Sequence, residues 1–157
     1  MRLKLKSKKG ASAVEFALIL PVLALILFGI IEFSIALYDK AIITNASREG
    51  GRAGIVARWD NNVSPAIYDP LTAAEIQTVV NNYLSNHLVT FAGPTSASFN
   101  PPITPCPPTG NSQTSSGSEL VVTVVYPYTF LVLPKLPKFA TKLTTINISA
   151  ETRMRCE

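Results

Sequence analysis

The sequence predicts an α+β fold in which a long apolar N-terminal helix leads into a small globular domain with one further helix and an antiparallel sheet of about three strands. Three observations support this prediction. An uncharged apolar run extends from Phe16 to Ile31. A helix-start pattern at Thr72 precedes apolar residues at helical spacing, and β-branched segments follow Glu119. Helical and strand patterns that are segregated along a chain are typical of α+β domains.

The positive charge of the chain is concentrated at its N-terminus. Residues 1–10 carry five Lys or Arg and no acid, whereas the whole chain has 14 basic and 10 acidic residues. Without those five, 9 basic residues face 10 acidic ones, so the basic pI belongs to residues 1–10. The remaining cations are scattered and have no interleaved aromatic residues, which argues against a nucleic-acid partner.

Residues 11–38 are predicted to form a membrane-spanning helix. Val14 to Tyr38 would extend roughly 37 Å as a helix, enough to cross a hydrocarbon core of about 30 Å with some tilt. Because basic residues crowd the N-terminal side, the positive-inside rule places Met1 in the cytoplasm. Residues 39–157 are then expected on the opposite side of the membrane, as a single-pass protein requires.

Glu15 lies at the mouth of the apolar run, where a carboxylate costs free energy unless it has a partner. One interpretation is an acid at a helix start, stabilised by the helix dipole and by Lys8 and Lys9. The other is that cleavage after Gly10 frees the α-amino group of Ala11, and that Glu15 pairs with such an amine, its own or a neighbour's. The sequence leaves both interpretations open.

The segment from Gly10 to about Gly54 combines several short motifs. They are Gly10 followed five positions later by Glu15-Phe16, then Leu20-Pro21, Gly29-Ile30-Ile31-Glu32 and Ala46-Ser47-Arg48-Glu49-Gly50-Gly51-Arg52. Together they resemble the TadE family of minor pilins, or pseudopilins, of the tight-adherence (Tad/Flp, type IVc pilus) system. The ending from Ser149 to Arg155 resembles the C-terminal strands of that family more loosely.

The resemblance implies a function in assembly. Residues 1–10 would be a prepilin leader that a membrane-embedded aspartic prepilin peptidase removes between Gly10 and Ala11, which leaves Glu15 and Phe16 at positions five and six of the mature chain. The expected partners are the major Flp pilin, other minor pilins, the inner-membrane assembly platform and membrane lipid. Phe16, where major pilins prefer Tyr, and the long region after the helix favour the minor-pilin branch, with adhesion or secretion as the output.

The helix is expected to continue beyond the membrane through residues 41–58. Ala46, Gly50 and Gly54 fall at i, i+4 and i+8 and therefore on one face. One interpretation is that the sheet of the domain packs closely on this face, as in pilin-like folds. The alternative is a poor helix, because each Gly costs about 1 kcal/mol relative to Ala.

The rest of the domain is predicted from local patterns. Residues 59–69 are interpreted as a turn region, and Thr72 with Glu75 forms a capping box that opens a helix to about His87. His87, the only histidine, is interpreted as a capping or surface residue. Residues 93–118, rich in Pro, Ser, Thr and Gly, are expected to be an exposed, flexible loop.

Three strands are predicted at the end of the chain: Glu119–Tyr126, Tyr128–Leu133 and Leu143–Thr152. In the last, Ile146, Ile148 and Ala150 alternate with polar residues. This alternation predicts a sheet with one face in water.

Cys106 and Cys156 are the only cysteines, and both lie outside the membrane by this topology. In an oxidising compartment they are expected to form a disulfide, with two free thiols as the alternative. Two distant cysteines and one histidine do not make a metal site. No phosphate-binding loop or nucleophile motif occurs, so neither an enzyme nor a cofactor is expected.

A second function stays open. The chain could be a membrane-anchored or exported periplasmic binding protein without a pilus role, because Ser34 and Ala36 are small residues suited to an ordinary signal peptidase. Glu32 is also open. It could mark the outer boundary of the membrane or contact another subunit.

Overall fold

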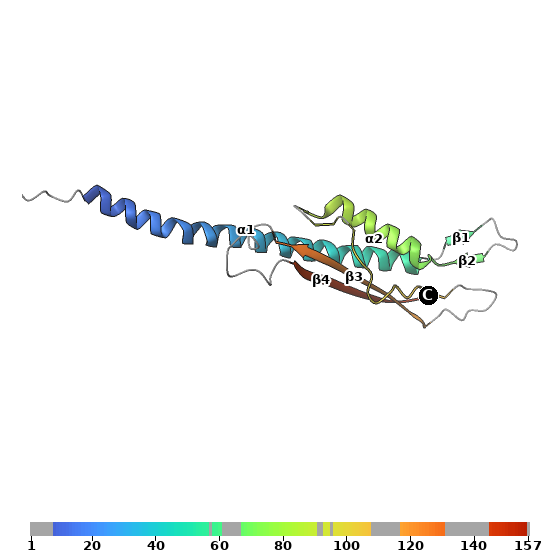
Figure 1. Ribbon diagram of the computed structural model, residues 1–157. Helices are drawn as coiled ribbons and strands as arrows, with labels where there is room; N and C mark the ends of the chain where they lie inside the picture. The colour runs from blue at the N-terminus through green and yellow to red at the C-terminus, as the bar shows by residue number, and fades with distance from the viewer. Residues whose placement is uncertain are drawn as a thin grey trace, which may run out of the picture.

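The computed structural model describes residues 8–56, 58–60, 67–90, 93–94, 96–107, 117–130 and 145–156. Two helices and four strands follow in the order α1 (Lys8–Ile55), β1 (Arg58–Asp60), β2 (Ile67–Asp69), α2 (Ala73–His87), β3 (Glu119–Thr129) and β4 (Thr145–Arg155). The C-terminal half of α1 packs against α2, β3 and β4, whereas its N-terminal half extends alone from the domain (Figure 1). The predicted α+β class is confirmed.

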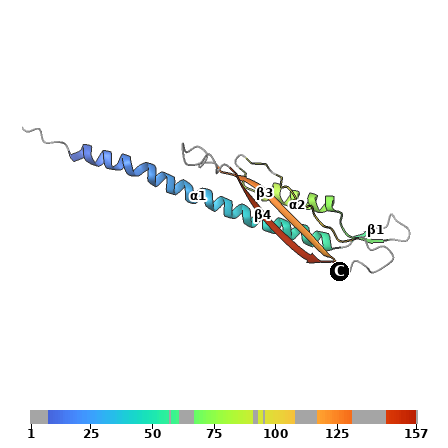
Figure 2. The same cartoon turned by 60° about the horizontal axis from the view of Figure 1, so that its bottom comes forward.

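Helix α1 is continuous over 48 residues and runs through Pro21. The predicted continuation beyond the apolar run is confirmed, because the helix ends only at Ile55. Turning the molecule shows the same division, with strands and second helix gathered along one half of α1 (Figure 2). The start of α1 therefore lies far from the domain.

The small residues on α1 allow close packing. Ala46 is fully buried, and a Cβ added to Gly50 would lie 2.5 Å from Val80 Cγ2. At Gly54 an added Cβ would lie 2.8 Å from both Ile76 Cδ1 and Leu120 Cδ2. Because no side chain fits in this space, the close-packing interpretation of the glycine face is confirmed, with α2 packing there together with the sheet.

Helix α2 begins and packs as its sequence predicts. Thr72 Oγ1 accepts a hydrogen bond from Glu75 N, and Glu75 Oε2 accepts one from Thr72 N at 2.8 Å, which completes the capping box. Ile76, Val80 and Leu84 are fully buried. Since these three recur at i, i+4 and i+8, one face of α2 closes the core against α1.

Among the described residues the main sheet has two strands, so the prediction of about three is wrong. Strands β3 and β4 pair antiparallel along their whole length, from Glu119 opposite Arg155 to Thr129 opposite Thr145. Tyr128 and Thr129 continue β3 instead of opening a separate strand. Residues 131–144, which include the remainder of the predicted Tyr128–Leu133 strand, lie outside the described residues.

The direction of the Pro127 nitrogen explains why this proline does not interrupt β3. Val125 exchanges backbone hydrogen bonds with Ser98, on the edge of β3 opposite to β4. In an antiparallel ladder, backbone groups two residues apart point to the same edge. The nitrogen of Pro127 therefore faces away from β4, and the missing N–H costs the β3–β4 ladder nothing.

The two faces of β4 differ as predicted. Ile148 and Ala150 are buried, while Thr145, Asn147 and Ser149 are exposed. The predicted alternation, with one wet face, is confirmed. On the buried face, Ser47 Oγ of α1 lies 2.7 Å from Thr152 Oγ1 and forms a hydrogen bond between helix and sheet.

Two expectations for the connecting segments need correction. Part of the region interpreted as a turn is a small antiparallel pair, in which β1 is bonded to β2. Part of the Pro-rich region is not an exposed loop, because Ser98 and Thr104 form bridges to β3 and Ile103 is 5% exposed. An extended Pro-rich segment can follow a strand edge wherever its non-proline residues supply the backbone donors.

Candidate functional site

The predicted processing junction lies at the free start of α1. Gly10, Ala11, Glu15 and Phe16 are all exposed, and apart from its chain neighbours and the helix backbone, no atom of the described residues lies within 4 Å of a Cβ added to Gly10. Residues 1–7, the greater part of the predicted leader, lie outside the described residues. Ala11 and Glu15 are one helical turn apart and on the same face, as side chains at i and i+4 are.

The protruding part of α1 is apolar on all sides. Exposed side chains include Phe16 at 63%, Leu18 at 72% and Ile30 at 63%. The helix is long and apolar enough to cross a membrane, and none of its most apolar window is buried by the domain. An apolar surface that surrounds a helix needs lipid or other protein to cover it.

Two acids on α1 are buried where the domain begins. Glu32 is 4% exposed and Asp39 is fully buried. Tyr128 Oη donates a hydrogen bond to the backbone carbonyl of Glu32 at 3.3 Å. Asp39 Oδ1 accepts one from Val89 N at 3.1 Å. The two acids therefore lie on the domain side of α1, two helical turns apart.

The buried acids and tyrosines influence one another electrostatically. Burial raises the pKa of Asp39, and the hydrogen bond from Val89 lowers it by a smaller amount. Burial also raises the pKa of Tyr128, which the negative charges of Glu32 and Asp39 raise further. Among the described residues, Asp39 Oδ2 has no hydrogen-bond partner, so its ionised form is poorly stabilised.

The buried position of Asp39 was not predicted from the sequence. Glu32 and Asp39 are seven residues apart, and Ala46 follows after seven more. That spacing of two turns puts all three on one helix face, and Ala46 was already assigned to the packing face. The heptad spacing was therefore a signal that could have placed both acids against the domain.

The exposed apolar start of α1 and most of its close-packed glycine face fall in a segment that is similar to a known family. Residues 10–52 match the family model described as TadE-like protein. The match confirms the resemblance to a TadE-like pilin of the Tad system over this segment. No curated protein and no solved structure matches the chain.

The TadE-like segment thus covers the exposed apolar start of α1, both buried acids and most of the glycine face, ending at Arg52. Within it, the residues of the predicted processing junction lie together at the exposed start of α1. The glycine face and the acids, in contrast, belong to the packing of the domain. One helix therefore combines an accessible end with a buried end.

Beyond the TadE-like segment, Cys106 and Cys156 are joined by a disulfide with a Cα–Cα distance of 5.8 Å. Cys156 directly follows β4, and its backbone N–H donates to Ser118 at 2.9 Å. The bond ties the Pro-rich segment to the end of the sheet. Both cysteines are buried.

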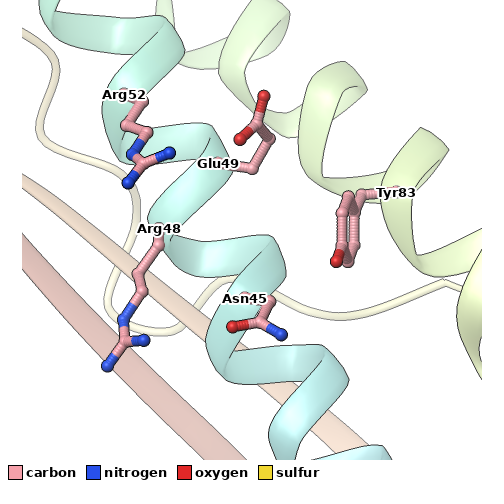
Figure 3. Close-up of a pocket in the computed structure, with 5 residues that line it drawn as sticks. All are labelled: Asn45, Arg48, Glu49, Arg52 and Tyr83. Atoms are coloured by element: carbon pink, nitrogen blue, oxygen red, sulfur yellow. The ribbon is translucent and has the colours of Figure 1, made fainter.

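A polar pocket of about 250 Å³ lies between α1 and α2. In Figure 3, Arg48 and Arg52 of α1 point away from α2, Glu49 points toward α2, and Tyr83 of α2 stands opposite Asn45. No ion pair joins these charged groups in the part of the chain that the structure describes. Among the same residues, no group of three or more His, Cys, Asp or Glu side chains could hold a metal ion.

Proposed function

We propose that the chain is a minor pilin (pseudopilin) of the Tad/Flp type IVc pilus system that is processed after Gly10 and acts by assembly rather than by catalysis. The observation that carries the proposal is the exposed start of α1. There Gly10, Glu15 and Phe16 stand at the end of a helix that is apolar on all sides, within the segment that matches the TadE-like model.

The proposed topology follows from charge and length. Residues 1–10 form a cytoplasmic leader, residues 11–38 the membrane and assembly helix, and residues 39–157 a domain that is periplasmic or exposed on a pilus. The free end of α1 suits a membrane-embedded prepilin peptidase, since no part of the described domain covers Gly10 or Ala11.

Glu15 has a role only after cleavage in this proposal. The new α-amino group at Ala11 would lie one turn before the carboxylate of Glu15, or a neighbouring subunit would supply the amine. Opposite charges attract each other far more strongly in a low-dielectric surrounding than in water. Pairing between subunits would therefore favour insertion beside the major Flp pilin, other minor pilins and the assembly platform.

The experiment determines the mature N-terminus by mass spectrometry of the protein from its native membrane, with and without the host's prepilin peptidase. A start at Ala11 that depends on the peptidase supports the proposal. An intact Met1, or a start at Leu37 after ordinary signal-peptidase cleavage, overturns it. Either result would favour the anchored or exported periplasmic protein instead.

A substitution tests the role of Glu15 separately. Glu15→Ala should leave cleavage intact and abolish incorporation into pili. The matched control is Glu49→Ala, which removes an exposed acid from the same helix and should leave both unchanged. Normal piliation by Glu15→Ala would contradict an assembly role for this carboxylate.

A further inference from the structure

A groove between α1 and β4 lies at the base of the domain and is unused by the proposed assembly role of Glu15. Its volume is about 310 Å³, and it is lined by Phe33, Leu37 and Lys40 of α1 and by Ile146 and Ser149 of β4, among others. Phe33 is 63% exposed and Leu37 56% exposed. The groove therefore has an open apolar floor.

The position of the groove along α1 is set by the domain. Ile30 and Ile31 are exposed, whereas Glu32 is buried and its carbonyl accepts the hydrogen bond from Tyr128. From Val14 to Leu37 the helix rises about 35 Å, enough to cross a hydrocarbon core of about 30 Å with some tilt. If α1 spans the membrane, Phe33 and Leu37 lie at the outer end of the hydrocarbon core and Lys40 lies at the level of the lipid headgroups.

The rim of the groove is polar and positively charged. Lys40 is the one charged residue among the described residues that line it, and its ammonium group donates to the carbonyl of Ser149. No acid stands among those lining residues. An anionic group at this rim would therefore meet one cation without a competing carboxylate.

The edge of β4 adds backbone donors to the rim. Ser149 lies opposite Val125, whose backbone groups bond to Ser98 on the far side of β3. Val125 and Ser149 therefore form a non-hydrogen-bonded pair, in which the N–H and C=O of Ser149 point away from β3. The same holds for Asn147, two residues earlier. Both N–H groups face the open edge beside the groove.

We propose that this groove binds a phospholipid of the surrounding membrane. The phosphate lies against the ammonium group of Lys40 and the outward N–H groups of Asn147 and Ser149, and an acyl chain covers Phe33 and Leu37. The proposal rests on the membrane span assigned under the proposed function. Continuity argues for lipid over a second copy of the chain, because the exposed Phe33 and Leu37 of the floor follow the exposed Ile30 and Ile31 along the same helix.

Bound lipid would fix the domain against the membrane before assembly. Phe33 and Ile146 belong to different elements, so a lipid that contacts both holds the sheet as well as the helix at the headgroup level. Departure of the subunit from the membrane would release that contact. The groove thus has a role in the membrane-bound state that is separate from processing at Gly10.

The first test places the groove in the membrane. The full chain, with isoleucine methyl groups labelled for NMR, is reconstituted in phosphatidylglycerol nanodiscs that carry spin labels either at the headgroup or at the end of the acyl chain. The headgroup label should broaden the Ile146 methyl more than the chain-end label does. Ile26, in the middle of the span, should respond in the reverse order.

The responses of the two methyl groups distinguish a failure of the lipid site from a failure of the membrane span. No response of Ile146 to either label, with a normal response of Ile26, overturns the lipid site and leaves the span intact. No response of Ile26 overturns the span itself. Protection of Ile146 that depends on protein concentration, together with cross-linked dimers, overturns the lipid site in favour of a second copy.

The second test measures affinity. Native mass spectrometry of the full chain in detergent, titrated with phosphatidylglycerol, should show binding about fivefold weaker for Lys40→Ala, since one Lys near an anionic surface contributes about 1 kcal/mol. Arg48→Ala is the matched control, because it removes an exposed cation two turns further along α1, and should bind like the wild type. Equal binding by the two variants overturns the proposal.

Discussion

Replacement of Gly50 by alanine should destabilise the domain even though alanine is the better helix former. The added Cβ would lie 2.5 Å from Val80 Cγ2, 3.4 Å from Ile76 Cγ2 and 3.6 Å from Val122 Cγ1. Overpacking of this kind costs about 1 to 3 kcal/mol, and the clash is with a short β-branched side chain held between two helices. The gain in helix propensity is about 1 kcal/mol. The expected net loss is therefore about 1 to 2 kcal/mol, taking the upper part of the overpacking range.

The assay is thermal unfolding of the full chain in detergent, followed by near-ultraviolet circular dichroism of the buried tyrosines. A loss of this size should lower the midpoint by roughly 5 to 10 °C for a domain of this length. Gly51→Ala is the matched control, because its Cβ would meet mainly the flexible Met154 side chain, with Sδ at 3.1 Å. It should change the midpoint far less. A Gly50→Ala midpoint at or above that of the wild type would refute the packing argument.

Three further predictions concern the disulfide, the buried acid and the helix cap. Cys156→Ser should lower the free energy of unfolding by about 4 kcal/mol, from the entropy of a 50-residue loop. Denaturation of the wild type under reductant should show the same loss. Because the pKa of Asp39 is raised, its contribution to stability is fully present below about pH 3.8 and is lost as pH rises through the raised value. Asp39→Asn should accordingly make the stability of the domain depend less on pH between neutrality and pH 4, in denaturant titrations at each pH. Thr72→Ala should cost about 1 kcal/mol in the same titrations, whereas Thr78→Ala, which removes an exposed hydroxyl in mid-helix, should be nearly neutral.

The elements that the sequence predicted well depend on local signals. The capping box at Thr72 fixes the start of α2, and the alternation in β4 fixes its buried face. The predicted processing junction is likewise a contiguous motif, at the exposed start of α1, and it stays a prediction. Local patterns of this kind hold because neighbouring residues satisfy one another's hydrogen bonds and burial, whatever lies elsewhere in the chain.

The errors in the sheet came from a long-range relation. The predicted strands Glu119–Tyr126 and Tyr128–Leu133 lie on either side of Pro127, and proline ordinarily demotes a strand. Whether a proline interrupts a ladder depends on which edge its nitrogen faces, and that edge is set by the register with Asn147. The burial of Ile103 also depends on long-range pairing, because the neighbouring Thr104 forms a bridge to Val121 of β3. Composition alone cannot show that a Pro-rich segment will pair with the edge of a strand.

The interpretation of Glu32 changes most clearly between the sequence and the structure. In the sequence it interrupts an apolar run and marks either a membrane boundary or a contact with another subunit. The structure buries it against the domain, with its carbonyl bonded to Tyr128. The burial of a carboxylate has to be compensated by nearby polar groups, which the base of the domain can offer and a lipid chain cannot. Glu32 therefore marks where the domain begins to cover one face of α1, while Phe33 and Leu37 on the other faces stay exposed, and the groove beside Phe33 and Lys40 begins at this level.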